Sequence, residues 1–172
     1  MLDLLQVQWL QKHLILGLVS SAAAGTEDIG RASCEALVSF LLALSETSRA
    51  SISKVISDVL LQQLSISATT DDRHVVPTME FLAFLLEQHL LSHDPSNAVG
   101  DIWNVMETVN APPASIQRLE TITKIYSALC VTERHKTRAV DKLTRLLLHR
   151  YPKVSCICNH SIVLCSTLTN VN

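Results

Sequence analysis

The chain has 172 residues, of which 48 % are hydrophobic and only 4 % aromatic, so one domain can bury a core built mainly from aliphatic side chains. Its 4 glycines and 5 prolines are too few for the turns of a β-sandwich or β-barrel, and the composition therefore favours helices. The formal net charge of −2 argues against nucleic acid as the main partner.

Charge and cysteine are unevenly distributed. Residues before Arg118 include 5 basic and 13 acidic side chains, whereas the remainder includes 9 basic and 3 acidic ones. An electrostatic binding surface is therefore expected in the C-terminal third. The 5 cysteines are odd in number and irregularly spaced, which is not typical of a disulfide framework and favours a reducing compartment.

The N-terminal region has two interpretations. LILGLVSSAAAG, at 14–25, resembles the apolar core and small-residue end of a signal peptide. The preceding segment is long, contains Asp3 and already has helical periodicity, so we favour a helix of the domain itself. No run of about 20 uncharged apolar residues is present to span a bilayer. We expect a cytoplasmic protein without membrane insertion.

Apolar residues recur at spacings of three and four in seven blocks, each of which predicts a helix. Capping and helix-breaking residues such as Thr26 and Pro95 separate the blocks. In the second block Phe40 is expected to face the core, and in the first block Leu14 lies beside the apolar side of the helix. The first five blocks cover approximately residues 2–20, 27–46, 50–65, 73–92 and 98–109; the sixth begins at Pro112–Pro113, and the seventh runs from a cap at Thr132 to Tyr151.

Helices without strand alternation predict an all-α fold. The missing heptad repeat argues against a long coiled coil. Short links between the helices favour a HEAT/armadillo-like α-solenoid segment of about seven helices over residues 1–152, in which antiparallel pairs stack on one another. A globular orthogonal bundle is the competing architecture. Residues 153–172 are predicted to form a separate, atypical, non-helical tail.

Motifs for catalysis or cofactor binding are absent from the sequence, including the phosphate-binding loop, the dinucleotide fingerprint, the hydrolase elbow and HExxH. We therefore expect no enzymatic activity, cofactor or metal. His89 and His93 stand four apart and could chelate a metal, but without a carboxylate or thiolate the pair is better explained by a helix C-terminus. Cys34 and Cys130 are expected to fill small spaces in the core.

The candidate partner-binding site is a basic stripe in the seventh block. Its members step by four, four and three, and so share one helix face: Arg134, Arg138, Lys142 and Arg145. Such a stripe can contact an acidic partner surface. The alternative is an ordinary solvated helix face.

Three stretches, in order over about residues 8–154, resemble the C-terminal region of the tubulin-folding cofactor D family. They are HLILGLVSSAAAGTEDIGRASCEALVSFL, VVPTMEFLAFLL and RAVDKLTRLLLHRYPKV. The resemblance implies a HEAT/armadillo-type chaperone of the cytoplasm and microtubule cytoskeleton. Family members are several times longer, so this chain is expected to be a C-terminal piece.

The resemblance also implies partners. Members of the family bind β-tubulin and work with tubulin-folding cofactors C and E and an ADP-ribosylation-factor-like small GTPase. Together these proteins assemble αβ-tubulin dimers and stimulate GTP hydrolysis on tubulin, with cofactor D acting as a scaffold. The alternative function is a different HEAT/armadillo scaffold, in transport or chromosome organisation.

The tail departs from the family pattern, which continues with a basic residue and an amphipathic helix. Lys153-Val154-Ser155 can be encoded by AAG-GTA-AGT, the usual form of an exon end that continues into a splice donor. This leads to the hypothesis that the tail is translated from an intron. The alternative is a zinc knuckle of Cys156, Cys158, His160 and Cys165, for which Cys-x-Cys is too tightly spaced.

Overall fold

The structure is a computed structural model that describes residues 8–24, 27–67, 72–91, 98–109, 115–130 and 133–169. These residues form eight α-helices and no strand, which confirms the predicted all-α class. The helices are α1 (Gln8–Ala24), α2 (Glu27–Ala43), α3 (Glu46–Ser67), α4 (Asp72–Glu87), α5 (Ala98–Val109), α6 (Ile116–Leu129), α7 (Glu133–Leu147) and α8 (Pro152–Thr169).

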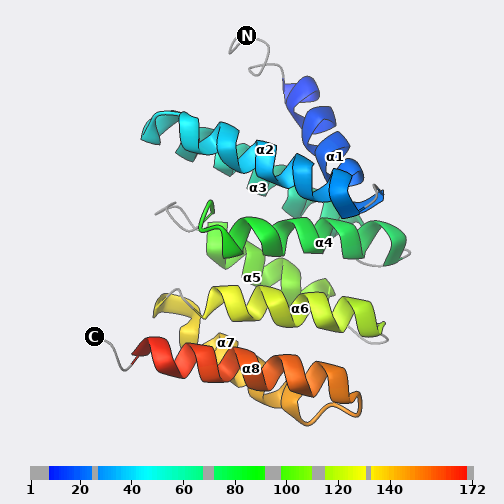
Figure 1. Ribbon diagram of the computed structural model, residues 1–172, viewed down its shortest axis with the longest axis vertical. Helices are drawn as coiled ribbons and strands as arrows, with labels where there is room; N and C mark the ends of the chain where they lie inside the picture. Colours follow the sequence, from blue (N-terminus) through cyan, green and yellow to red (C-terminus); the bar gives the residue numbers. More distant parts are fainter. Residues whose placement is uncertain are drawn as a thin grey trace.

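The helices stack in two layers (Figure 1). α2, α4, α6 and α8 lie in the front layer of this view, and α3, α5 and α7 lie behind them. α4 packs on α6 and α6 on α8 within the front layer, while α3 packs on α5 behind. Contacts of α3 with α4, of α6 with α7 and of α7 with α8 join the layers. This layered stacking is that of an α-solenoid segment.

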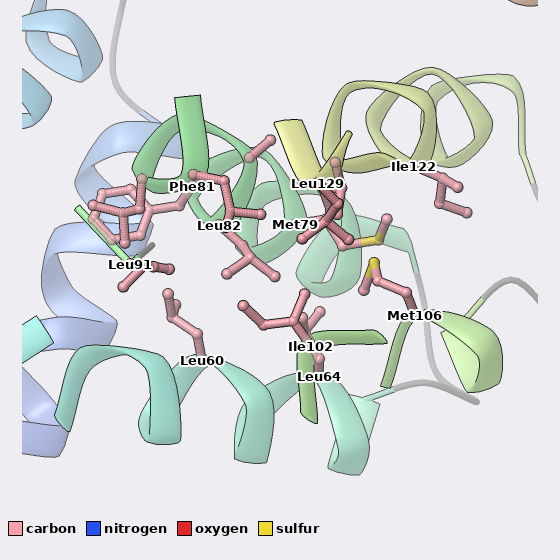
Figure 2. Packing of buried hydrophobic residues seen from close by; sticks show 14 of the residues in the cluster. Leu60, Leu64, Met79, Phe81, Leu82, Leu91, Ile102, Met106, Ile122 and Leu129 are labelled. Atoms are coloured by element: carbon pink, nitrogen blue, oxygen red, sulfur yellow. The ribbon is translucent and has the colours of Figure 1, made fainter. Parts of the chain in front are cut away.

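The core lies between the two layers and is mainly aliphatic, as the composition predicts. Figure 2 shows Leu60 and Leu64 of α3, Met79 of α4 and Ile102 of α5 converging on one another, and all four are fully buried. Burying one such side chain contributes about 1.5–3 kcal/mol. Cys130 is buried in this core and Cys34 is half-buried at its edge, as expected for small apolar fillers.

Hydrogen bonds at the helix ends set where the helices begin and end. The hydroxyl of Ser115 accepts a hydrogen bond from the amide of Arg118 at 3.1 Å and caps α6. At the C-terminal end of α4, His89 has a φ of 56°, and the amide of Leu90 donates to the carbonyl of Leu85 at 3.0 Å. The left-handed His89 after the helix and the hydrogen bond from Leu90 back to Leu85 form a Schellman-type helix end. Histidine here occupies the position that glycine usually takes.

The prediction of a non-helical tail after residue 152 is wrong, because Pro152–Thr169 form the helix α8. Proline is well suited to the first helical position, since its missing amide hydrogen would have no partner there. Val154 and Cys158 are buried and Ile162 is partly buried, and their spacing of four makes one apolar helix face. Serines, cysteines and β-branched residues on the opposite face carry no charge, which concealed this periodicity in the sequence.

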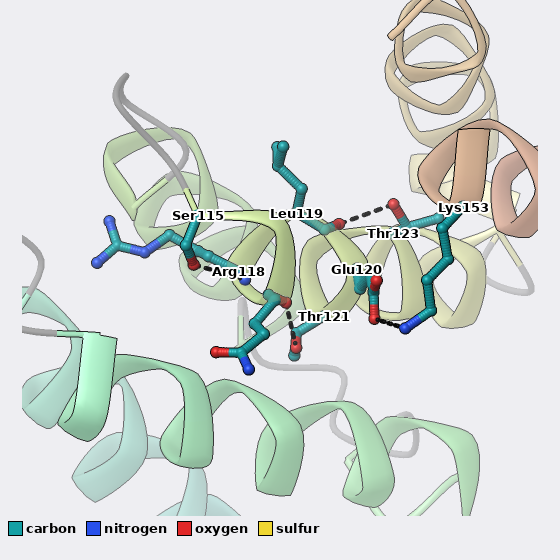
Figure 3. A network of polar contacts seen from close by, with 8 residues as sticks. Ser115, Arg118, Leu119, Glu120, Thr121, Thr123 and Lys153 are labelled. Atoms are coloured by element: carbon teal, nitrogen blue, oxygen red, sulfur yellow. Dashed lines mark hydrogen bonds and ion pairs between the residues drawn. The ribbon is translucent and has the colours of Figure 1, made fainter. Parts of the chain in front are cut away.

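Polar contacts attach α8 to the helices before it. Figure 3 shows the ammonium of Lys153 pairing with the carboxylate of Glu120 on α6, at 2.9 Å. The hydroxyl of Ser155 donates to the carbonyl of Leu147 at 2.8 Å and so caps the end of α7. α8 therefore packs as part of the helical array. The intron origin of its coding sequence stays a prediction that sequencing of spliced transcripts would test.

Phe40, expected in the core, is instead exposed, together with Leu14. Leu14 is 48 % exposed and Phe40 45 % exposed, because both line an open groove at the α1–α3 end of the array. None of the described helices combines the length and apolarity needed to cross a membrane. The proposed caps at Thr26 and Thr132, and the residues before 8, lie outside the described part of the chain.

Candidate partner-binding site

The basic stripe lies on α7, and its members differ in their surroundings. Arg138 is the most closely bound to the rest of the protein. Its guanidinium carbon lies 4.5 Å from the centre of the Trp103 ring, which is a cation–π distance. One of its nitrogens, Nη2, lies 3.7 Å from Oε1 of Glu107. Both partners belong to α5, so Arg138 points toward the neighbouring helix of the rear layer rather than straight into solvent.

Lys142 shares the same carboxylate. Its Nζ lies 3.4 Å from Oε1 of Glu107, so two cations of α7 converge on one anion of α5. Arg145 pairs within its own helix, with Nη2 at 3.1 Å from Oδ2 of Asp141, and remains 73 % exposed. Arg134 belongs to α7, but its side chain lies outside the described residues.

Buried aromatic rings support this surface from below. The Trp103 ring lies 5.3 Å from the Tyr126 ring and 6.2 Å from the His135 imidazole, centre to centre. All three side chains are buried. The Trp103 ring is therefore held in place under Arg138 by contacts with both α6 and α7, which limits the positions that the guanidinium can occupy.

The stripe keeps a positive charge despite these contacts. Glu107 faces both Arg138 and Lys142, so one negative charge stands against two positive charges. Exposed ion pairs of this kind contribute only about 0–1 kcal/mol, and a partner's carboxylate can replace Glu107 at little cost. The arrangement can therefore bind an acidic surface by charge, with Arg138 and Arg145 as the most exposed donors among the described members.

Sequence reasoning missed the two α5 residues of this site, Trp103 and Glu107. They stand four apart and so share one helix face, which was a usable signal. The sequence alone does not predict, however, that this face of α5 lies beside α7. The partner of Arg138 becomes identifiable only when the stacking order of the helices is known.

The histidine and cysteine candidates remain apart from this site. His89 is an exposed residue just after the end of α4, and His93 lies outside the described residues. Cys156 is exposed on α8 and Cys158 is buried, while the side chain of Cys165 is not described. Among the side chains that the structure describes, His, Cys, Asp and Glu form no group of three or more that could hold a metal ion.

Comparison with known protein families now adds an independent observation. The sequence profile described as "Tubulin folding cofactor D C terminal" matches residues 1–111, which is more than half of the chain. The chain belongs to the tubulin folding cofactor D C-terminal family. No curated protein matches the chain significantly, and neither does any solved structure.

Membership in the cofactor D C-terminal family agrees with the resemblance in the first two quoted stretches. It places the chain in tubulin folding and implies tubulin-related partners. The matched region contains α1 to α5, including Trp103 and Glu107. The basic stripe on α7 lies beyond that region, so the match shows the family of the chain without identifying the stripe as its site.

Proposed function

We propose that this chain is a non-enzymatic scaffold that binds β-tubulin during the assembly of αβ-tubulin dimers. The observation that carries the proposal is the match of residues 1–111 to the cofactor D C-terminal family. The stacked helices support it, because α-solenoid segments offer extended surfaces for binding other proteins. In this proposal the chain acts in the cytoplasm, in association with the microtubule cytoskeleton.

The proposed mechanism is one of holding rather than chemistry. The scaffold keeps β-tubulin in an orientation that the other participants recognise. These are tubulin-folding cofactors C and E and an ADP-ribosylation-factor-like small GTPase. Together they stimulate GTP hydrolysis on tubulin, and the bond is broken in tubulin's own nucleotide site.

We assign the charged part of the contact to the basic stripe. Arg138, Lys142 and Arg145 lie on one surface with a single facing carboxylate between the first two, and Arg134 continues the spacing along α7. Attraction between this surface and an acidic partner weakens as salt is added, because ions screen exposed charges over about 8–10 Å at physiological ionic strength.

The test is capture of β-tubulin by the full 172-residue chain over a series of salt concentrations. Glutamate replaces all four stripe residues, Arg134, Arg138, Lys142 and Arg145, in one variant. A control of equal charge change replaces four exposed cations on other helices, Arg31, Lys54, Arg73 and Lys124. Circular dichroism of each variant verifies that it is folded.

We expect capture to weaken about tenfold or more in the stripe variant and little in the control, since close charge pairs at an interface contribute more than 1 kcal/mol each. Equal capture by both variants would remove the stripe from the proposal and leave tubulin binding in place. Absence of capture by the folded, unmodified chain would contradict the proposed function.

A further inference from the structure

Glu107 stands between two cations of the basic stripe, although it belongs to another helix. Its Oε1 lies 3.7 Å from Nη2 of Arg138 and 3.4 Å from Nζ of Lys142. α5 and α7 both lie in the rear layer of the array (Figure 1), so the carboxylate contacts the stripe from a neighbouring helix. Glu107 therefore occupies the position at which the carboxylate of a partner would meet these two cations.

Both contacts are longer than those of a tightly bound carboxylate. Charge-assisted hydrogen bonds from ammonium or guanidinium groups are about 2.7–2.9 Å long. Lys153 and Glu120 reach that length, at 2.9 Å, between α8 and α6. The side chains of Glu107 and Arg138 are 44 % and 56 % exposed, so water screens their attraction. A carboxylate that forms shorter hydrogen bonds can therefore displace Glu107.

The Trp103 ring holds Arg138 in position independently of Glu107. The ring is 1 % exposed, and its centre lies 4.5 Å from the guanidinium carbon. This contact is between the positive charge and the face of the ring, and it leaves the N–H groups of the guanidinium available to donate to a carboxylate. Arg138 therefore stays prepared for a partner when Glu107 is displaced.

Glu107 also sets how much charge the surface presents. Arg138, Lys142 and Arg145 supply three positive charges, and their carboxylate partners Glu107 and Asp141 supply two negative ones. These five side chains together have a net charge of +1, which becomes +2 when Glu107 is neutral. A single side chain thus halves the positive charge that attracts an acidic partner.

We propose that Glu107 is an intramolecular competitor for the ligand of the basic stripe, and that this ligand is a carboxylate-rich segment of a protein partner. A carboxylate of that segment displaces Glu107 and takes its place between Arg138 and Lys142. Glu107 then remains nearby and repels the segment, so it lowers the affinity and makes the contact easily reversible. The identity of the partner as the folding client rests on the proposed function, whereas the competition does not.

The first experiment measures binding of an acidic peptide to the full 172-residue chain. The probe is a short, end-capped peptide of alternating glutamate and glycine, labelled with fluorescein. The control ligand has glutamine in place of each glutamate. Fluorescence anisotropy gives the dissociation constants at ionic strengths of about 0.01 M and 0.15 M, between which the screening length falls from about 30 Å to about 8 Å.

Charge-matched variants isolate the effect of Glu107. Glu107→Gln removes the charge and keeps the shape of the side chain. Glu80→Gln, the control, removes one charge from an exposed position on α4, outside the stripe. A third variant, Arg138→Gln with Lys142→Gln, removes the two cations, and Glu107→Gln is repeated in that background as a double-mutant cycle. Circular dichroism verifies that each variant is folded.

We expect Glu107→Gln to bind the acidic peptide about three- to tenfold more tightly than the unmodified chain, because two charge contacts no longer oppose binding. Glu80→Gln should bind like the unmodified chain, and the gain from Glu107→Gln should vanish in the background that lacks both cations. Equal or weaker binding by Glu107→Gln would overturn the proposal, since Glu107 would then contribute nothing or position the cations. Equal binding of the glutamine peptide, or no peptide binding, would overturn it too.

A parallel capture of β-tubulin separates this proposal from the proposed function. Stronger capture by Glu107→Gln than by Glu80→Gln supports the client as the ligand of the stripe. Equal capture by both variants, beside tighter peptide binding, overturns the client as that ligand while tubulin binding stands. Tighter peptide binding, without tubulin capture by the unmodified chain, supports the competition and contradicts the proposed function.

Discussion

Cys156 and Cys158 stand two residues apart on α8 and lie in opposite environments. Cys156 is exposed, whereas Cys158 is buried with its Sγ 3.7 Å from the hydroxyl of Thr123. Burial raises the pKa of the Cys158 thiol, and its hydrogen bond with Thr123 partly opposes this effect. Burial also raises the pKa of Cys34. The thiolate is the reactive form, so burial protects both thiols from modification.

We expect iodoacetamide to alkylate Cys156 at least about tenfold faster than Cys158 in the folded chain at pH 8, because the buried thiol is neither accessible nor ionised. Peptide mapping by mass spectrometry after timed quenching measures both rates. Denaturant should bring the rates together, which is the control. Equal rates in the folded chain would show that this face of α8 does not pack on α6.

The same raised pKa values predict how stability changes with pH. A thiol with a higher pKa in the folded state holds its proton more tightly there. Its stabilising contribution is complete below the unfolded pKa and is lost as the pH rises through the folded value. Cys34 and Cys158 therefore lower stability on the alkaline side of the ordinary thiol pKa.

At the scale of elements, prediction succeeded where polar and apolar residues alternate clearly. The fifth block was predicted at 98–109, and α5 is Ala98–Val109. The last helix was missed because its outer face has serines, cysteines and an asparagine in place of charges, so its period was hard to see. The packing of α8 on the other helices depends on its one apolar face, which contains Val154, Cys158 and Ile162.

Val154→Asp tests that face. Val154 is completely buried on α8, and a carboxylate there would be desolvated against α6 and α7, so we expect a loss of about 3–5 kcal/mol of unfolding free energy. Val163→Asp, on the exposed face of the same helix, should change it by less than about 1 kcal/mol. Urea unfolding followed by circular dichroism compares the two. Equal effects would mean that α8 does not stabilise the array.

At the scale of the whole molecule, the side chain of Arg118 joins three helices through an ion pair and a hydrogen bond. The guanidinium of Arg118, at the start of α6, is buried and pairs with the carboxylate of Asp72 at the start of α4. Its Nη1 also donates to the carbonyl of Val109, the last residue of α5, at 3.4 Å. This contact crosses the boundary of the family-matched region, since Asp72 lies within residues 1–111 and Arg118 beyond them.

Because only the arginine is deeply buried, the two halves of this pair should differ in their effect on stability. Asp72→Asn leaves a buried, unpaired cation and should cost about 3 kcal/mol. Arg118→Met leaves a carboxylate that water can reach and should cost about 1 kcal/mol. Denaturant titrations of both variants give the comparison. A larger loss for Arg118→Met would show that hydrogen bonding to α5, rather than charge burial, dominates at this joint.

The sequence by itself determined the first seven helices, the all-α class and the family, because helical periodicity and caps are local properties that packing only reinforces. The tertiary structure alone decided which surfaces are free. Arg138 and Lys142 face Glu107 because the stacking order sets α7 beside α5, and Phe40 is exposed because α2 and α3 leave a groove between them. A periodic pattern identifies the apolar face of a helix, but whether a neighbour covers that face depends on how helices distant in sequence pack.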